Sequence, residues 1–233
     1  MSAPYGAGSD SSNSDSDIRN FSFTVPTGVT TSSNLHAVVT SEDSAGELPS
    51  FVEIYLDSGG SGSGQNLTYI DGQVLEDGTD NMLSYYALDN CPYAAGAAVT
   101  VSAHFTNNQQ RRNAAIFFTD GYSPESVVAG TDTIKNSSGS GDCAINVSNP
   151  PSSSLLLALY NTGGEDTLTA VNCTQLINDP NASMALFVGY VDPAATTNNL
   201  PATGATSRST AMVVLVPAAG GSGPVMGMEG WAA

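Results

Sequence analysis

Cysteine and histidine are the residue types in this sequence best suited to metal binding or catalysis, and both are scarce. The cysteines are Cys91, Cys143 and Cys173, and the histidines are His36 and His104. A zinc site needs its ligands at short and regular spacings, which none of these residues has. We therefore expect packed or surface histidines, and thiols that are buried and free, paired in a disulfide, or placed at a contact between subunits.

The carboxylates do not form a recognisable catalytic or metal-binding pattern either. The segment from Asp77 through Asp80 to Asn81 resembles half of a calcium loop, but it lacks the alternating acids and the distal glutamate that such a loop needs. Nucleophile elbows, P-loops and dinucleotide-binding fingerprints are all missing. The sequence therefore predicts no catalytic residue, no cofactor site and no metal site, and a protein that is not an enzyme.

The charge of the chain is strongly one-sided. Its 22 acids and five bases give a net charge of -17, Lys135 is the only lysine, and Arg111 and Arg112 are the only adjacent bases. Phosphate binding needs clustered Lys and Arg, so nucleic acid is not expected as a direct partner. Molar salt shortens the Debye length to ~3 Å and screens such repulsion. The composition favours a high-salt environment, and the alternative is an ordinary acidic, soluble protein.

The elements that would position these residues are predicted to be β-strands. The clearest pattern spans 152–171, where the apolar run 155–159 ends at Tyr160, a glycine-rich turn follows, and 167–171 alternates polar with apolar residues. This pattern is typical of a hairpin whose first strand is covered on both faces. Helical periodicity is absent over any useful window. Strands are also predicted at 21–25, 35–39, 51–56, 67–70, 83–88, 99–105, 114–118, 126–129, 144–147, 184–191 and 209–216.

Two glycine- and serine-rich segments suggest how these strands are divided. They lie at 57–65 and 136–142. One interpretation is an inserted upper β-domain at 58–142, with 18–57 and 143–216 forming one eight-stranded jelly-roll β-barrel. The other is a single sandwich in which both segments are long loops. The sequence supports the two interpretations equally.

The two ends of the chain have a different composition from the strands. Residues 1–17 are small and polar, which predicts a flexible arm without a secretory signal. No segment is long and apolar enough for a transmembrane helix. The tail 217–233 carries Trp231, which is expected to anchor in the groove of a neighbouring subunit or to fold back onto its own barrel.

The chain resembles the larger major capsid protein of icosahedral, internal-membrane viruses of halophilic archaea. The resemblance rests on its length, the single lysine, the small-residue arm and the strands FVEIYL, AIFF, SLLLALY, MALFVGY and MVVLV. It implies a vertical single jelly roll topped by a smaller β-domain that forms a tower. The implied partners are further copies of the chain, a second smaller capsid protein, and an internal membrane or its proteins beneath the shell. The implied location is the virion, assembled in the host cytoplasm.

A protein of a different class remains as the alternative. It is a haloarchaeal cell-surface adhesion module or carbohydrate-binding β-sandwich, for which Tyr85, Tyr86 and Tyr93 are the candidate binding platform. Packing in the core is the commoner role of tyrosines in strands. An export signal upstream of an alternative start codon would favour this alternative.

Overall fold

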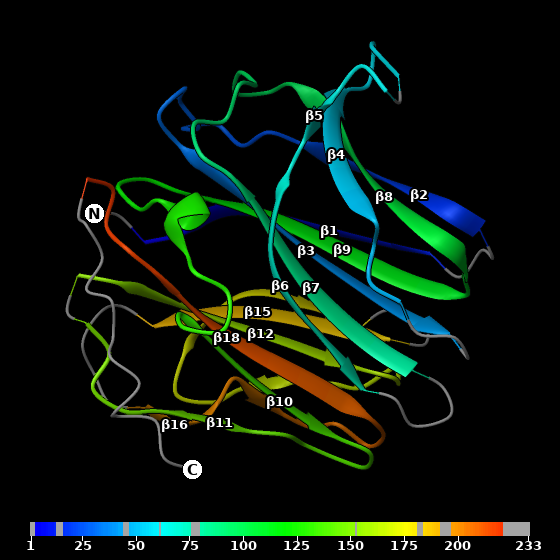
Figure 1. Cartoon of the computed structure of the whole chain (residues 1–233), viewed down its shortest axis with the longest axis vertical. Helices are drawn as coiled ribbons and strands as arrows, with labels where there is room; N and C mark the ends of the chain where they lie inside the picture. Colours follow the sequence, from blue (N-terminus) through cyan, green and yellow to red (C-terminus); the bar gives the residue numbers. More distant parts are fainter. Residues whose placement is uncertain are drawn as a thin grey trace.

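The protein is built almost wholly of antiparallel β-strands, stacked in layers. The computed structural model describes residues 3–12, 16–43, 47–60, 62–75, 80–151, 153–180, 184–191 and 197–220. Three large sheets lie above one another along the long axis of the molecule, and we call them the upper, middle and lower sheets after their places in Figure 1. None of the sheets closes into a barrel. No described helix is long and apolar enough to cross a membrane.

The first half of the chain forms the upper and middle sheets. The upper sheet contains, in spatial order, β2 (Ser16–Thr24), β8 (Ala98–Gln109), β4 (Phe51–Leu56) and β5 (Gln65–Asn66). The middle sheet contains β1 (Tyr5–Ser12), β9 (Arg111–Thr119), β3 (Asn34–Asp43), β7 (Asp80–Leu88) and β6 (Thr68–Leu75). From β2 to β4, successive strands alternate between the two sheets.

The second half of the chain forms the lower sheet and two short ribbons beneath it. The lower sheet contains β10 (Thr133–Ser138), β18 (Ser209–Val216), β12 (Leu155–Thr162), β15 (Ala185–Val191) and β14 (Thr174–Asp179). The ribbons pair β11 (Ile145–Val147) with β16 (Thr197–Leu200), and β13 (Thr169–Ala170) with β17 (Ala202–Thr203). A single 3-10 turn, η1 (Pro124–Ser126), lies between the two halves in the sequence.

Three apolar cores alternate with the sheets. The first fills the space between the upper and middle sheets, the second lies between the middle and lower sheets, and the third lies between the lower sheet and the ribbons. The central strands of the middle and lower sheets, such as β9, β12 and β18, are therefore buried on both faces. This explains the unbroken apolar run of β12, in which Leu155, Leu157 and Leu159 face the second core while Leu156 and Ala158 face the third.

The predicted hairpin at 152–171 is wrong, although its first strand is confirmed. β12 is flanked by β15 and β18, and β13 pairs with β17 instead of returning along β12. The half-polar segment 167–171 could not cover the side of a strand that is apolar on both faces. The apolar strands β15 and β18 can do so, and both are buried across the layers.

The strand pairing also differs from the predicted division of the chain. Strands β2, β3 and β4 of the segment 18–57 pair with strands from 58–142, and none of them pairs with a strand from 143–216. The segment 136–142 is not a linker throughout, because residues 136–138 continue β10 along β18. Gly- and Ser-rich composition marks solvent-exposed edges here, which a short strand can occupy as readily as a loop.

Two smaller predictions are also corrected. Tyr5–Ser12, placed in a flexible arm, forms β1 along β9. The predicted strand at 126–129 does not form, because residue 126 ends the 3-10 turn η1, which begins at Pro124, and 127–129 continue as loop and turn. Proline fixes its own φ and favours the start of a helical turn. The other predicted strands exist, several of them with extended ends.

Candidate functional site

The carboxylate of Glu42 lies between two arginines where the middle and lower sheets meet. Glu42, near the end of β3, is only 2% exposed. Its Oε2 lies 3.0 Å from Nη1 of Arg111, which stands directly opposite it on β9. Its Oε1 lies 2.5 Å from Nη2 of Arg208, which precedes β18 in the lower sheet. One buried acid therefore binds a base of its own sheet, Arg111, and a base of the lower half, Arg208.

A second ion pair joins the same two sheets at β6 and β10. Nζ of Lys135 lies 2.9 Å from Oδ1 of Asp71, and the Thr133 hydroxyl donates to the other carboxylate oxygen at 2.5 Å. Burial alone would raise the pKa of Asp71. Hydrogen bonds from Thr133, Lys135 and the Gly72 N–H, together with the lysine charge, outweigh burial and hold this pKa below its usual value.

Amide side chains also connect the middle sheet to the lower half. Asn161 Nδ2 donates to the Met82 carbonyl at 3.1 Å and also to Asn81 Oδ1. Asn113 Nδ2 donates to the Met184 carbonyl at 3.0 Å. We call these contacts together the interlayer seam, which comprises Glu42, Asp71, Asn81, Met82, Arg111 and Asn113 of the middle sheet and Lys135, Asn161, Met184 and Arg208 of the lower half.

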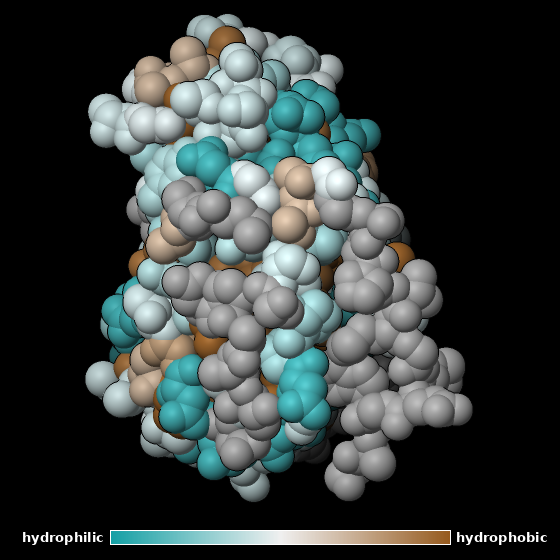
Figure 2. Space-filling view, turned by 90° about the vertical axis from the view of Figure 1, so that its left-hand side faces the viewer, coloured by the Kyte–Doolittle hydropathy of each residue, from teal (hydrophilic) through white to brown (hydrophobic). Residues whose placement is uncertain are grey.

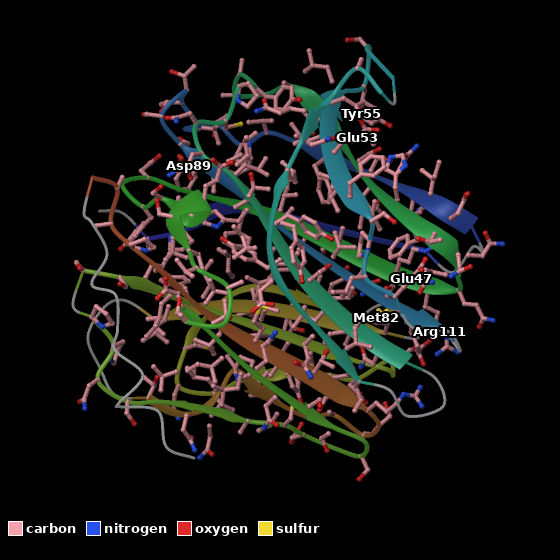
Figure 3. All side chains as sticks on the ribbon, viewed as in Figure 1. Glu47, Glu53, Tyr55, Met82, Asp89 and Arg111 are labelled. Carbon is pink, nitrogen blue, oxygen red and sulfur yellow. The ribbon has the colours of Figure 1, made fainter. Side chains whose placement is uncertain are left out.

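The seam opens into a polar pocket of about 240 Å³, lined by Glu42, Gln110, Arg111 and Arg208. Figure 3 shows Arg111 at the right-hand end of the layers. The lining supplies charge and hydrogen bonds but no nucleophile and no second carboxylate. Its chemistry is therefore that of a structural ion-pair site.

A second pocket, of about 350 Å³, has Asp89 and Asp120 in its lining, and Asp89 lies at the opposite side from Arg111 in Figure 3. Asp120 accepts hydrogen bonds from the Tyr5 and Ser33 hydroxyls at 3.1 and 2.7 Å. The Ser123 hydroxyl donates to Asp89 at 2.5 Å. Both carboxylates thus have local donors, and no group of three His, Cys, Asp or Glu that could hold a metal occurs in the described ranges.

The two histidines occupy different environments. His36 is fully buried in the middle sheet, with its ring nitrogens 2.7 Å from the hydroxyls of Tyr85 and Thr119. Burial lowers the pKa of His36 to about 3, so its ring is neutral at ordinary pH. His104 lies on the outer face of the upper sheet, stacked on Phe51 at 4.0 Å between ring centroids. His36 therefore has the predicted packed role, and His104 has the predicted surface role.

All three thiols are free in this structure. Cys91 and Cys143 are buried, whereas Cys173 is partly exposed. Burial raises the pKa of Cys143 and of Cys173 to about 11, which keeps both as thiols near neutral pH. The predicted place of a cysteine at a subunit contact therefore rests on Cys173, the one that solvent reaches.

Other candidate residues are also placed by the structure. Tyr85 and Tyr86 are buried in separate cores on opposite faces of β7, so they cannot form the proposed carbohydrate platform with Tyr93. Alternate residues of a strand point to opposite faces, which separates any adjacent pair. Trp231 and Asp77 lie outside the described residues.

Comparisons with protein-family models, curated proteins and solved structures give no match. No sequence pattern marks Glu42, Asp71 or Arg208 as important residues. One signal was available, because a folded chain with five bases and 22 acids is expected to place those bases beside acids. The sequence did not show which acids these would be.

Proposed function

We propose that this chain is a structural protein, the major capsid protein that forms the icosahedral shell of a halophilic virus. The observation that carries the proposal is the inward use of its few bases. Arg208 and Lys135 each bind an acid of the middle sheet from the lower half, and Arg111 shares the acid bound by Arg208. Two of the five bases, Lys135 and Arg208, therefore connect the lower half to buried acids of the middle sheet.

The acidic surface of the protein is suited to high salt. A fourth base, Arg112, is only 1% exposed, so the net charge of -17 is presented mainly by acids among polar residues. On the face seen in Figure 2, hydrophilic and intermediate colours predominate outside the grey regions, and apolar residues form small separate patches. Molar salt screens exposed charges strongly but buried pairs much less. Internal ion pairs can therefore hold such a subunit together in brine.

The layered architecture suits a subunit that must be rigid in a wall. We assign the upper and middle sheets to one jelly-roll-type β-domain and the lower sheet with its ribbons to a second β-domain. The alternation of β2, β3 and β4 between two facing sheets supports the first assignment. The second apolar core and the interlayer seam, which both lie between the middle and lower sheets, would make the two domains move as one body.

The proposal also covers partners and location. The chain assembles with further copies of itself and with a second smaller capsid protein, over an internal membrane or its proteins. It does not bind nucleic acid directly, and it has no catalytic role. Its location is the virion, after assembly in the host cytoplasm.

Density-gradient fractionation of the source culture tests this function. An antibody against the chain should label virus-sized particles, and the chain should be among the most abundant proteins of the particle band. Recovery in the cell-envelope fraction, with none in the particle band, would instead support the adhesion-module alternative.

A further inference from the structure

Two loops in the second half of the chain are held in place by strand pairing at both ends. The loop 163–168 joins β12 to β13, and the loop 204–208 joins β17 to β18. β12 pairs with β18 as far as Thr162 and Ser209, the residues next to the two loops. At the other end of the loops, β13 pairs with β17. The two loops therefore have a fixed position relative to each other.

The first loop carries a buried carboxylate, Asp166, which is only 4% exposed. Its Oδ1 accepts a hydrogen bond from the Thr206 hydroxyl of the second loop at 2.6 Å. Its Oδ2 is closed to solvent and has no hydrogen-bond partner among the described residues. None of the ion pairs between described residues includes Asp166, and Arg208 of the second loop binds Glu42 instead. One hydroxyl donor leaves the charge of Asp166 uncompensated, whereas buried charges are normally paired or bound to a metal.

A second buried oxygen, Ser207 Oγ, faces the same place as Asp166 Oδ2. It is also closed to solvent and has no hydrogen-bond partner in the described part of the chain. Asp166 Oδ2 and Ser207 Oγ each lie 3.2 Å from the position that a Cβ on Gly164 would take. The Arg208 guanidinium lies beside the preceding residue, Gly163. Because Gly164 has no side chain, a small ion beside it would have both oxygens as neighbours.

We propose that Asp166 and Ser207 bind a sodium ion beside Gly164. Both side chains offer only oxygen, the ligand atom that hard cations prefer. The single carboxylate supplies one negative charge, which a monovalent cation balances, whereas calcium sites usually combine several carboxylates. A water molecule could bridge the two oxygens, but it would leave the charge of Asp166 in place. The bound ion would tie the two loops together, and this inference does not depend on the proposed role in a capsid.

The test is denaturant unfolding of the full chain in sodium chloride and, at equal ionic strength, in tetramethylammonium chloride, whose cation is too large for the site. We call the ratio of the two unfolding equilibrium constants the sodium effect. With sodium ~10-fold above its dissociation constant, unfolding should be ~10-fold less favourable in the sodium salt. Asp166→Asn should abolish this effect, and Ser207→Ala should reduce it. Gly164→Ala should also abolish it while keeping both ligands, because the new Cβ would lie 3.2 Å from each oxygen and Gly164 has no positive φ that requires glycine.

Glu165→Gln is the matched control, because it removes an exposed carboxylate from the neighbouring position and should keep the sodium effect. A purely structural role of Asp166 would lower stability equally in both salts, and Gly164→Ala and Ser207→Ala test the site even if Asp166→Asn does not fold. An equal sodium effect in the wild type, Asp166→Asn and Gly164→Ala would overturn the inference. Equal losses in Asp166→Asn and Glu165→Gln would also overturn it, because they would indicate a diffuse ion atmosphere. So would stabilisation of the wild type by millimolar calcium without any sodium effect, which would indicate a divalent site.

Discussion

Nζ of Lys135 lies 2.9 Å from Oδ1 of Asp71, and the two residues belong to different sheets. The only lysine of the chain therefore connects the lower sheet to the middle sheet. Arg208 makes the same kind of connection through Glu42. Because the two contacts lie on different strands of the middle sheet, together they oppose rotation of one layer over the other.

The pair of Asp71 and Lys135 should be measurable by a double-mutant cycle. Asp71→Asn leaves Lys135 and Thr133 without their carboxylate, so the free energy of unfolding should fall by ~1–3 kcal/mol. Lys135→Gln should cost less, because the lysine side chain is 31% exposed. Denaturant unfolding in constant molar salt measures both, and the double mutant should show coupling of the two changes. Asp17→Asn, an exposed control with the same charge change, should stay within ~0.5 kcal/mol of wild type; an equal loss in Asp71→Asn and Asp17→Asn would refute the role of the pair.

Acid should weaken the contact between Asp71 and Lys135. The pKa of Asp71 in the folded chain lies below its unfolded value. The stabilisation is therefore present above the unfolded pKa and is lost as the pH falls through the folded pKa. In Asp71→Asn this acid-dependent part of the unfolding free energy should be missing, which unfolding curves at successive acidic pH values would test.

Substitution of Glu42 should be more damaging. Glu42→Gln leaves Arg111 and Arg208 without the carboxylate that they share, and the Glu42 side chain is only 2% exposed, so we expect a loss of ~3 kcal/mol in unfolding free energy. Arg111→Gln should cost clearly less, because the Arg111 side chain is 40% exposed and Arg208 would still hold Glu42. Chemical unfolding of both variants gives the comparison. Equal losses would mean that the carboxylate does not act as the shared centre.

His36 should make the fold sensitive to mild acid. Its pKa is about 3 in the folded chain and 6.5 in the ordinary reference state. Between these values the unfolded chain binds one more proton at this site, so stability falls as the pH drops from about 6.5 toward 3. His36→Gln removes the imidazole that takes up this proton on unfolding. The slope of unfolding free energy against pH should therefore decrease by ~1.4 kcal/mol per pH unit relative to wild type. Parallel wild-type and variant slopes between pH 4 and 6 would contradict the prediction.

The strands that could be predicted from the sequence are those with local apolar patterns. β4 and β18 begin and end where predicted, at Phe51–Leu56 and Ser209–Val216, because polar residues bound β4 and a proline follows β18. β1 was not predicted, since its sequence YGAGSDSS has no apolar alternation and it gains its stability by pairing with β9. The pairing partners of β12 could not be predicted either, because several apolar strands could pair with its two edges.

The interlayer seam could not be predicted, because its contacts are distant in the sequence. Glu42 and Arg208 are separated by 166 positions and meet only because the lower sheet stacks on the middle one. The scarcity of bases predicts that each will find an acid, but the choice of acid follows from sheet order and strand register. Both properties depend on long-range packing.

The cysteine prediction now concerns one residue. Cys91 and Cys143 are buried, so oxidation after release of particles should cross-link neighbouring subunits through the partly exposed Cys173. Non-reducing electrophoresis of intact particles should show a dimer band that is absent from Cys173→Ser particles. Only monomer in wild-type particles, or a dimer band that persists in Cys173→Ser particles, would contradict cross-linking through Cys173.

The central claim is that the acidic surface adapts the contacts between subunits to brine while internal contacts hold each subunit together. The screening length is ~8 Å in ordinary saline and ~3 Å in molar salt. Salts that are excluded from protein surfaces also strengthen apolar burial. Contacts between molecules with a net charge of -17 should therefore weaken on dilution of the salt before the buried ion pairs and three cores of each subunit fail.

Stepwise dilution of assembled material, followed by light scattering and far-UV circular dichroism together, tests this claim most directly. Scattering should fall to that of free subunits while the β-sheet signal is still intact, and divalent cations should partly protect the assemblies. Assemblies that remain whole at ~0.1 M salt without divalent ions, where screening extends to ~10 Å, would contradict the account, as would loss of the β-sheet signal before any subunit is released.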